Sequence, residues 1–479
     1  MRKLFIAAIS VAFALSLSAQ SRFTPAVDAE VAEIMSKMTL DEKLKIIGGS
    51  GWMTTNGVER LGIKGMKFSD GPQGVGSHGK STAYPSAVTL AATWNPDFAY
   101  KYGTALAADC KAKGVNVLLG PAVNIYRAPM CGRNFEYMGE DPFLASRMAV
   151  GYIKGLQDHG IMGVVKHFAL NNSEYDRNFI SNDADERTLN EIYFPAFKAA
   201  VQEAEVGALM TSYNLYKGIY TTESPWLLSD ILRKQWGFKG MVMSDWEAAH
   251  HDIVTARSGL DLEMPSAKYT SAEKMKYYLV SGDVTMRMID DKVRHILHAQ
   301  LAFGFKGGAG KVLPEQENPA CVATALDVAE EAVVLLKNRK NTLPVNPKRV
   351  KRIVVTGNNA VGFVRGGGSG NVSPVRYTSM LDGIGAVGKE HGVQVDYIDP
   401  QMMLPQIAYT DGTLKEHGFN AAYYANARLE GNPVRIQTEK HISYQWPGNG
   451  ESKGLPATDF SVRWTGVLCS DKTLDYEFV

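Results

Sequence analysis

The stretch that decides the fold is Gly240-Met241-Val242-Met243-Ser244-Asp245-Trp246, in which an apolar run stops abruptly at a carboxylate followed by a large aromatic side chain. An unbroken apolar run is typical of a strand buried on both faces, as in a parallel sheet. The polar residues then lie where the strand ends, which in an α/β barrel is the face that carries active sites. Taken alone, the stretch favours a plainer interpretation, in which Asp245 caps the following helix. The rest of the chain reverses that preference.

The pair Asp245 and Trp246 also suits a particular chemistry. A carboxylate can attack the anomeric carbon of a sugar, and an indole can pack against the apolar face of the sugar ring. The two residues are therefore candidates for a carbohydrate site.

Length and composition indicate a globular protein of two or three domains. The chain has 479 residues, of which 45% are hydrophobic and 21% charged, so it has ample material for a core. The formal net charge is +1, which offers no electrostatic reason to expect nucleic acid or an anionic membrane as a partner.

The first residues are typical of a secretory signal peptide over residues 1–19. Arg2 and Lys3 supply the positive start, residues 4–17 form an apolar run, and Ala19 precedes the expected cleavage point. The run is short for a membrane span, and no Cys follows it for a lipid anchor. We expect export to a periplasm or outside the cell, without membrane insertion after signal removal. An uncleaved anchor is the alternative.

The cysteines predict neither a disulfide scaffold nor a metal site. Cys110, Cys131, Cys321 and Cys469 are few and scattered, and no CxxC pattern is present. Cys110 and Cys131 are the only pair near enough in sequence to suggest a bridge, but buried free cysteines are common and are favoured here. We expect no metal and no organic cofactor.

From residue 85 onward, helical patterns alternate with short apolar runs. The helical patterns cover residues 97–113, 146–159, 189–205 and 225–236, and the apolar runs cover 115–119, 163–165, 208–210, 241–243 and 260–264. This alternation indicates right-handed βαβ units and a parallel sheet. The number of units predicts a (β/α)8 TIM-type barrel over residues 20–305, with an open doubly wound sheet as the alternative.

Polar side chains close successive apolar runs at the same end. Because the carboxyl ends of parallel strands meet at one face of a barrel, these side chains should converge there. An earlier short strand ends in the same way, at Asp70 before a Gly/Pro turn, although a turn residue is its commoner role. The candidates that follow the runs are Arg133, Lys166, His167, Tyr213, Asp245 and Trp246.

The second part of the chain changes character twice. Residues 306–317 have a composition that predicts a linker. Residues 318–415 are predicted to be the start of a second α/β domain, with strands at 352–356 and 393–398. The glycine-rich loop 365–371 could approach a ligand closely or be a surface linker. From residue 416 to 479, short alternating strands predict the opening of an all-β domain. We expect the chain to be a piece of a longer protein.

Four motifs, taken together and in order, resemble the family 3 glycoside hydrolases, the β-glucosidase group. They are Ser69-Asp70-Gly71-Pro72, Gly132-Arg133-Asn134-Phe135-Glu136-Tyr137 with Glu140-Asp141-Pro142, Lys166-His167-Phe168 and the stretch from Gly240 to Trp246. The resemblance covers about residues 25–412. The tail from Phe419 resembles the first part of a PA14 domain, a β-rich module that some of these enzymes carry inside their second domain, which is an α/β sandwich.

The resemblance implies an exo-acting, retaining β-glycosidase that hydrolyses terminal β-linked sugars, most simply β-D-glucose, with an oligosaccharide or β-glycoside as substrate. Asp245 would be the nucleophile. Asp70 would hold hydroxyls of the terminal sugar, Arg133, Lys166 and His167 would be basic sugar-binding residues, Tyr213 would lie near the nucleophile and Trp246 would form a wall of the pocket. For the remaining charged residues we expect structural roles. Glu136, Glu140 and Asp141 would orient Arg133 and cap the next helix, and Arg127 would do the same. Glu263 would line the floor of the barrel or form an ion pair.

Two departures from the family pattern limit what the resemblance implies. The Lys166-His167 pair continues as Phe168-Ala169-Leu170-Asn171-Asn172, without the Pro-Gly-His pattern of the N-acetylhexosaminidase branch. The acid/base Glu of the β-glucosidase branch lies further along its second domain than this chain extends, so no residue is assigned to that role. A β-xylosidase or another specificity in the same family, or a carbohydrate-binding protein without catalysis, remain alternatives, and the sequence indicates no oligomeric state.

Overall fold

The computed structural model describes residues 21–398, 407–440, 442, 454–456 and 459–469. It divides into two compact units, one formed by residues up to 336 together with 365–376, and the other by residues 337–364 and those from 377 onward. The predicted signal peptide at 1–19 lies outside the described residues. No helix in the described ranges combines the length and the apolar character needed to cross a membrane.

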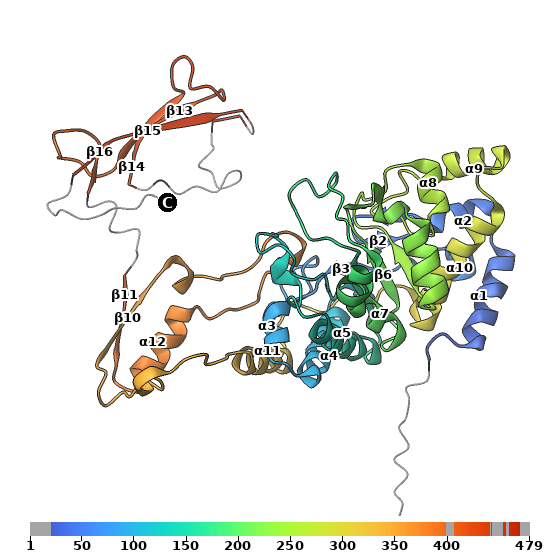
Figure 1. Ribbon diagram of the computed structural model, residues 1–479, viewed down its shortest axis with the longest axis horizontal. Coiled ribbons are helices and arrows are strands. Elements are labelled where there is room, and N and C mark those ends of the chain that lie inside the picture. The colour runs from blue at the N-terminus through green and yellow to red at the C-terminus, as the bar shows by residue number, and fades with distance from the viewer. Residues whose placement is uncertain (1–20, 399–406, 441, 443–453, 457–458, 470–479) are drawn as a thin grey trace, which may run out of the picture. The chain divides into compact units, whose positions relative to one another are not determined.

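The first unit contains a five-stranded parallel sheet in the order β3-β4-β5-β6-β9, of which Figure 1 labels β3 and β6. The strand order follows the chain without reversal, which excludes the doubly wound alternative, since that fold changes direction at a central switch point. The strand of the opening motif lies where the sequence predicted it. The bounds are β3 Phe68–Asp70, β4 Val117–Leu119, β5 Met162–Phe168, β6 Ala208–Thr211 and β9 Met241–Met243.

Beyond both edges of this sheet, single bridges replace regular strands. Met243 pairs in parallel with Leu262, and Glu263 in parallel with Gly48, while Thr54 pairs with Lys67 next to β3. The predicted strand at 260–264 is thus present as isolated bridges and not as a ladder. The short strands β1 (Gly49–Gly51) and β2 (Thr54–Thr55) form an antiparallel hairpin in the same region.

The strands are buried on both faces, which accounts for their unbroken apolar runs. Val165, Leu209 and Val242 pack into one hydrophobic cluster with helices α4, α5 and α7. Their neighbours in the strands, such as Ala208 and Met243, pack into a second cluster with α1, α2 and α10. Successive strand residues point to opposite faces, so both faces need apolar side chains. These helices are α1 Pro25–Lys37, α2 Leu40–Ile46, α4 Pro96–Ala112, α5 Pro142–Asp158, α7 Pro195–Gln202 and α10 Met286–Ala302.

Several helix boundaries follow from local sequence. Thr39 and Glu42 form a reciprocal capping box at the start of α2. Asp141 accepts hydrogen bonds from the amides of Phe143 and Leu144 and caps α5. The predicted helix at 225–236 is a π-helix, Trp226–Gln235. Other helices and strands of this unit include α3 Ala87–Ala92, α6 Glu186–Thr188, the π-helix Leu189–Tyr193, α8 Asp252–Arg257, α9 Ala272–Ser281, β7 Leu215–Tyr216 and β8 Ile219–Tyr220.

Helix α11 (Pro319–Glu331) belongs to the first unit, where Cys321 and Val328 are buried in the cluster that contains α4. The division into compact units therefore does not follow the predicted domain start at 318. The helix ends at Glu331, and residues 333–336 are exposed and not helical.

The second unit has two parts. Strands β10 (Arg352–Thr356) and β11 (Gln394–Ile398) pair in parallel beside α12 (Met380–Glu390), in agreement with the two predicted strands. A three-stranded antiparallel sheet has the order β14-β13-β15, with bounds Arg435–Glu439, Phe419–Tyr424 and Ser461–Thr465. β12 (Ala408–Tyr409) pairs with β16 (Val467–Leu468). The described part of the tail is thus β-rich, as its alternating pattern predicted.

Candidate active site

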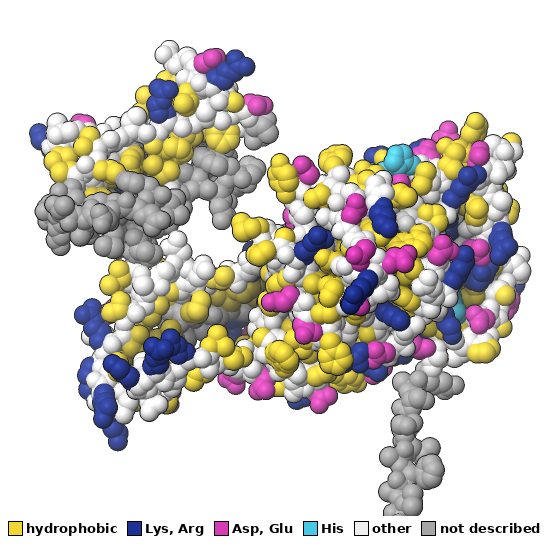
Figure 2. All heavy atoms as spheres, viewed as in Figure 1, with side chains coloured by type: hydrophobic (Ala, Val, Ile, Leu, Met, Phe, Trp, Pro, Cys, Tyr) yellow, Lys and Arg dark blue, Asp and Glu magenta, His cyan; other side chains and the backbone are white. Residues whose placement is uncertain are grey.

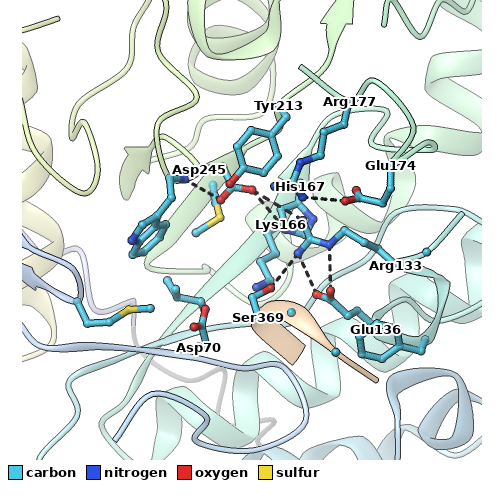
Figure 3. A pocket seen from close by; sticks show the side chains of 18 of the residues that line it. Asp70, Arg133, Glu136, Lys166, His167, Glu174, Arg177, Tyr213, Asp245 and Ser369 are labelled. Atoms are coloured by element: carbon cyan, nitrogen blue, oxygen red, sulfur yellow. Dashed lines mark hydrogen bonds and ion pairs between the residues drawn. The ribbon is translucent and has the colours of Figure 1, made fainter. Parts of the chain in front are cut away.

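A cavity of about 690 Å³ opens at the carboxyl ends of the parallel strands in the first unit (Figure 3). All seven residues proposed from the sequence line it: Asp70, Arg133, Lys166, His167, Tyr213, Asp245 and Trp246. Residues far apart in the chain converge because each follows, or ends, a strand of the same sheet, as Asp70 at the end of β3 and Trp246 after β9 do. The cavity is also lined by Trp52, Met53, Leu119, Gly132, Phe135, Glu136, Glu174, Arg177, Met210, Gly367, Gly368 and Ser369.

Asp245 lies two residues beyond the end of β9 and is buried, with 7% of its surface exposed. Its Oδ1 accepts a hydrogen bond of 2.7 Å from the amide of Trp246, which orients the carboxylate. Its Oδ2 lies 4.0 Å from an Nη of Arg133 and 3.7 Å from Nε2 of His167, and accepts no hydrogen bond within the described part of the chain. One oxygen is therefore fixed, and the other faces the cavity with a free lone pair.

Arg133 precedes the short 3-10 helix Asn134–Glu136, which brings Glu136 back against it. Both oxygens of Glu136 accept from the guanidinium, at 2.9 and 3.1 Å, and Ser369 Oγ lies 3.2 Å from it. Burial alone would lower the pKa of Arg133, but the Glu136 charge outweighs it and raises that pKa well above the ordinary value. The expected orienting role of Glu136 is confirmed.

Lys166 and His167 end the buried strand β5 and have almost no exposed surface. Burial lowers the pKa of Lys166, although the carboxylates of Glu136, Asp70 and Asp245 oppose that shift. Burial, together with the charges of Arg133, Lys166 and Arg177, lowers the pKa of His167 well below its usual value, so the imidazole is neutral at pH 7. Two hydrogen bonds between the backbone of His167 and the side chain of Asn124 hold this strand end in place.

Asp70, the last residue of β3, lies on the cavity wall (Figure 3). Its Oδ2 accepts a hydrogen bond of 3.1 Å from Ser77. Burial raises the pKa of Asp70, while the positive charge of Lys166 partly offsets that effect. The geometry leaves its carboxylate available to accept from ligand hydroxyl groups.

Tyr213 and Trp246 form an aromatic side of the cavity. The hydroxyl of Tyr213 points towards Asp245 (Figure 3), and burial and the Asp245 charge raise the pKa of that hydroxyl. The indole of Trp246 donates to the backbone oxygen of Trp52 at 2.9 Å, and the two indoles meet edge to face with centroids 6.1 Å apart. Trp52, in the β1–β2 turn, was not proposed from the sequence; a tryptophan next to Gly51 in a tight turn was the available signal.

The glycine-rich loop 365–371 belongs to the first unit and contributes Gly367, Gly368 and Ser369 to the cavity. The loop therefore approaches the site closely, which was one of the two interpretations of its sequence, and is not a surface linker. A Cβ on Gly366 would lie 2.2 Å from the ring of Phe135, so the glycine is needed for close packing.

Among the other charged residues, Asp141 has the structural role that was expected, whereas Glu263 and Arg127 make different contacts. Asp141 caps α5, as anticipated. Glu263 neither faces the cavity nor pairs with a cation in the described chain; it accepts hydrogen bonds from the amides of residues 268, 269 and 270. Arg127 contacts the backbone oxygen of Asp183 at 3.4 Å and does not orient Arg133.

Glu174 and Arg177 line the cavity and were missed. They form an ion pair of 2.7 Å on the loop after β5, and a charged i,i+3 pair following Asn171-Asn172 was the only sequence signal. All four cysteines are free, so the favoured alternative of unbridged cysteines holds. Among the described residues, no three His, Cys, Asp or Glu side chains gather as metal ligands would.

The site thus combines an oriented carboxylate with an open lone pair, buried cations, a second carboxylate and an indole wall. This set is typical of proteins that bind and process carbohydrates.

On the face of the first unit that Figure 2 shows, cationic and anionic side chains are interspersed.

The chain belongs to glycosyl hydrolase family 3. The model of the family's N-terminal domain matches residues 28–299, and that of its C-terminal domain matches residues 333–453. A β-glucosidase of Rhizobium radiobacter is 36% identical over 467 residues, which is 94% of this chain and 55% of that protein. β-Glucosidase BoGH3A of Bacteroides ovatus is 38% identical over 399 residues, 76% of this chain and 53% of that protein.

Among solved structures, β-glucosidase 3B of Thermotoga neapolitana in complex with glucose superimposes with a TM-score of 0.70 and 33% sequence identity. The match covers 77% of this chain and 55% of that one. The chain spans about half the length of the relatives it matches.

Proposed function

We propose that this protein is an exo-acting, retaining β-glucosidase in which Asp245 is the nucleophile. The observation that carries the proposal is the free Oδ2 of a buried, oriented carboxylate that lies 4.0 Å from Arg133 in a cavity of about 690 Å³. The β-glucosidase relatives support the substrate class.

In the first step of the proposed reaction, Asp245 Oδ2 attacks the anomeric carbon and forms a glycosyl-enzyme, while the aglycone oxygen leaves with a proton. In the second step, water resolves the ester and the product keeps the β configuration. Arg133 lies 4.0 Å from the attacking oxygen, and the charges of Arg133 and Lys166 make the surroundings of the nucleophile positive. The neutral His167 adds no charge but can form a hydrogen bond to the sugar.

Recognition of the terminal sugar is assigned to groups around the nucleophile. Asp70 accepts from sugar hydroxyls, and Lys166, Arg133 and His167 donate to them, which gives strong and oriented hydrogen bonds. Trp246 offers its ring face to the apolar side of the sugar. Asp70 holds sugar hydroxyls but does not distinguish glucose from xylose, so the preference for glucose rests on the β-glucosidase relatives.

No acid/base residue is assigned to the described part of the cavity. Its three other carboxyl groups are already engaged: Glu136 with Arg133, Glu174 with Arg177 and Asp70 with Ser77. A test of the nucleophile should therefore use a leaving group that departs without protonation.

The deciding experiment is intact-mass spectrometry after incubation with a 2-deoxy-2-fluoro-β-glucoside that carries a dinitrophenolate leaving group. One added fluoroglucosyl unit, mapped by peptide sequencing to Asp245, is the expected result. The matching xyloside tests specificity, and faster labelling by it would replace glucose with xylose. A folded protein that binds glucose but takes up no label would instead indicate a carbohydrate-binding protein.

We further propose that residues 20–305 form a (β/α)8-type barrel, followed by a linker at 306–317, an α/β sandwich beginning at 318–415 and a PA14-like β-rich part at 416–479. The sequential parallel sheet and the bridges at Leu262, Glu263 and Gly48 support the barrel. Limited proteolysis should cut first within 306–317. Cuts confined to positions beyond 376 would contradict the linker.

We also propose that residues 1–19 direct export to a periplasm or the outside of the cell, on the basis of their charge and apolar run. N-terminal sequencing of the protein from its own cells should begin at Gln20. A retained Met1 would contradict cleavage.

A further inference from the structure

The pair Arg177 and Tyr213 forms a contact that the proposed reaction leaves unused. The guanidinium carbon of Arg177 lies 4.0 Å from the centroid of the Tyr213 ring, within the range of a strong cation–π interaction. The opposite end of the same ring carries the hydroxyl that points towards Asp245 (Figure 3). Arg177 is therefore linked to the nucleophile through one aromatic ring.

Backbone hydrogen bonds hold the segments that carry Arg177 and Tyr213 next to each other. The amide of Leu215 donates to the oxygen of Ile180, and the amide of Asn182 donates back to the oxygen of Leu215, each at 2.9 Å. These bonds join the loop that carries Arg177 to the segment that carries Tyr213. The stacking is consequently built into the fold.

Glu174 fixes the other side of the guanidinium. Its Oε2 accepts from Arg177 at 2.7 Å, and its side chain lies against Gly132, the residue before Arg133. With a carboxylate at its edge and a ring at its face, Arg177 has little freedom to turn elsewhere. The three residues Glu174, Arg177 and Tyr213 form a chain of contacts that ends at the nucleophile.

A cation over a phenol ring draws electron density from the hydroxyl and makes it a better hydrogen-bond donor. We propose that Arg177 is a positioning residue for Asp245 that acts through Tyr213, by fixing the ring whose hydroxyl faces the carboxylate and by making that hydroxyl more positively polarised towards it. This inference rests on the proposed function, in which Asp245 is the nucleophile. The charge of Arg177 also contributes to keeping His167 neutral, and His167 lies 3.7 Å from Asp245 Oδ2.

The test is a double-mutant cycle on the labelling reaction of the full chain, with Arg177→Gln, Tyr213→Phe and the double variant. The maximal labelling rate and the inhibitor concentration at half-maximal rate are measured separately with the fluoroglucoside. Arg177→Gln should lower the maximal rate about tenfold, the size expected for a partly buried cation–π contact, with little change in half-saturation. In the Tyr213→Phe background, Arg177→Gln should have almost no further effect.

Two variants and one control separate this role from a structural one. Arg177→Lys keeps the charge but not the planar fork, so it should recover part of the rate, and Glu174→Gln should cause a smaller loss than Arg177→Gln. The matched control is Arg147→Gln, because Arg147 also pairs with a carboxylate, Glu203, and lies over a ring, Phe143, outside the cavity. The control should label at the parent rate.

An Arg177→Gln effect of equal size in the parent and in the Tyr213→Phe variant would overturn the proposal. A change confined to half-saturation would do the same, because it would mean that Arg177 binds the sugar directly. Failure of the proposed function has a different signature, since the parent protein would then take up no label at Asp245.

Discussion

Arg133 lies 4.0 Å from Asp245 Oδ2, and it is held there by a two-point ion pair with Glu136. The guanidinium and both carboxylates are almost fully buried. A charge in such surroundings acts on its neighbour more strongly than at the surface, because little water screens it. The effect of the Arg133 charge on Asp245 can therefore be tested separately from the contribution of the Arg133–Glu136 pair to stability.

Replacing Arg133 with Gln should reduce the rate of fluoroglucosyl labelling by about 10²- to 10³-fold, comparable to the loss of one charge-stabilising donor. It should also lower the unfolding temperature, because Glu136 is left as an unpaired buried charge. In the double variant Arg133→Gln/Glu136→Gln, the unfolding temperature should recover while the labelling rate stays low. Recovery of both quantities together would show that Arg133 matters only for stability.

Asp245→Asn should lower turnover of an activated glucoside by at least about 10³-fold, because the amide cannot act as the nucleophile. Circular dichroism and the unfolding temperature should match those of the parent. In Asp245→Gly, added azide should restore consumption of the substrate and give a glucosyl azide of inverted, α configuration. Asp252→Asn, on α8 and paired with Lys274, is the control and should remain active. A β-configured azide product would contradict the assignment.

Asp70 should make sugar binding sensitive to pH. Burial raises its pKa above the usual value of 3.8, so the carboxylate becomes protonated at a higher pH than an ordinary Asp. Protonation removes acceptor strength, and glucose affinity should therefore fall as the pH drops through that raised pKa. Glucose inhibition constants measured between about pH 4 and pH 7 should show this decline in the parent. In Asp70→Asn, affinity should be lower throughout and the decline smaller; an unchanged decline would assign it to another group.

Six of the seven proposed site residues lie at or just after strand ends, which has one physical reason, whereas Arg133 was proposed from its motif and follows β4 at a distance. Each strand of the sheet is apolar on both faces, so the polar stretch that follows a run such as 241–243 marks the strand end, and parallel strands bring their ends together. Asp245, Lys166 and Tyr213 are found by that rule.

The rest of the site depends on contacts that have no local pattern. Ser369 reaches Arg133 across 236 positions of sequence, and Trp52 meets Trp246 across 194. Arg177 lies in an irregular loop whose place is set by hydrogen bonds to Leu215. The segment 260–264 has the composition of a strand, yet it forms only single bridges, from Leu262 to Met243 and from Glu263 to Gly48. Its pairing depends on where those neighbouring segments lie, which its own sequence does not specify.

Glu223 should be essential for the order of the loop that follows Asp245 and Trp246. It is buried, and its Oε1 accepts from the amides of His250 and His251 at 2.7 Å and from the hydroxyl of Thr255 at 2.9 Å. Glu223→Ala removes these acceptors at once and should lower the free energy of unfolding by about 3 kcal/mol or more. Faster hydrogen exchange at the amides of residues 250 and 251 should accompany it.

The control for Glu223 is Glu191→Ala, which breaks an exposed ion pair with Arg187. Exposed pairs contribute about 0–1 kcal/mol, so this variant should unfold close to the parent. Equal effects of the two substitutions would show that the Glu223 contacts carry no special stability.

Lys292 should make the stability of the first unit depend on alkaline pH. It is buried on α10, where it donates to the backbone oxygen of Leu260, and burial lowers its pKa from 10.5 to about 8. Between these two values, the unfolded chain binds a proton that the folded chain does not. Stability from this group therefore increases as the pH rises from about 8 to 10.5, and the full cost of burying the charge is present below pH 8.

Lys292→Met removes that titration. The difference in free energy of unfolding between parent and variant should shift in favour of the parent by about 2–3 kcal/mol between pH 7 and pH 10. Thermal unfolding at fixed salt across that range measures the shift, with Lys154→Met, an exposed residue of α5, as the control that should show none. A difference that stays constant with pH would mean that Lys292 titrates as an ordinary lysine, which would contradict the lowered pKa.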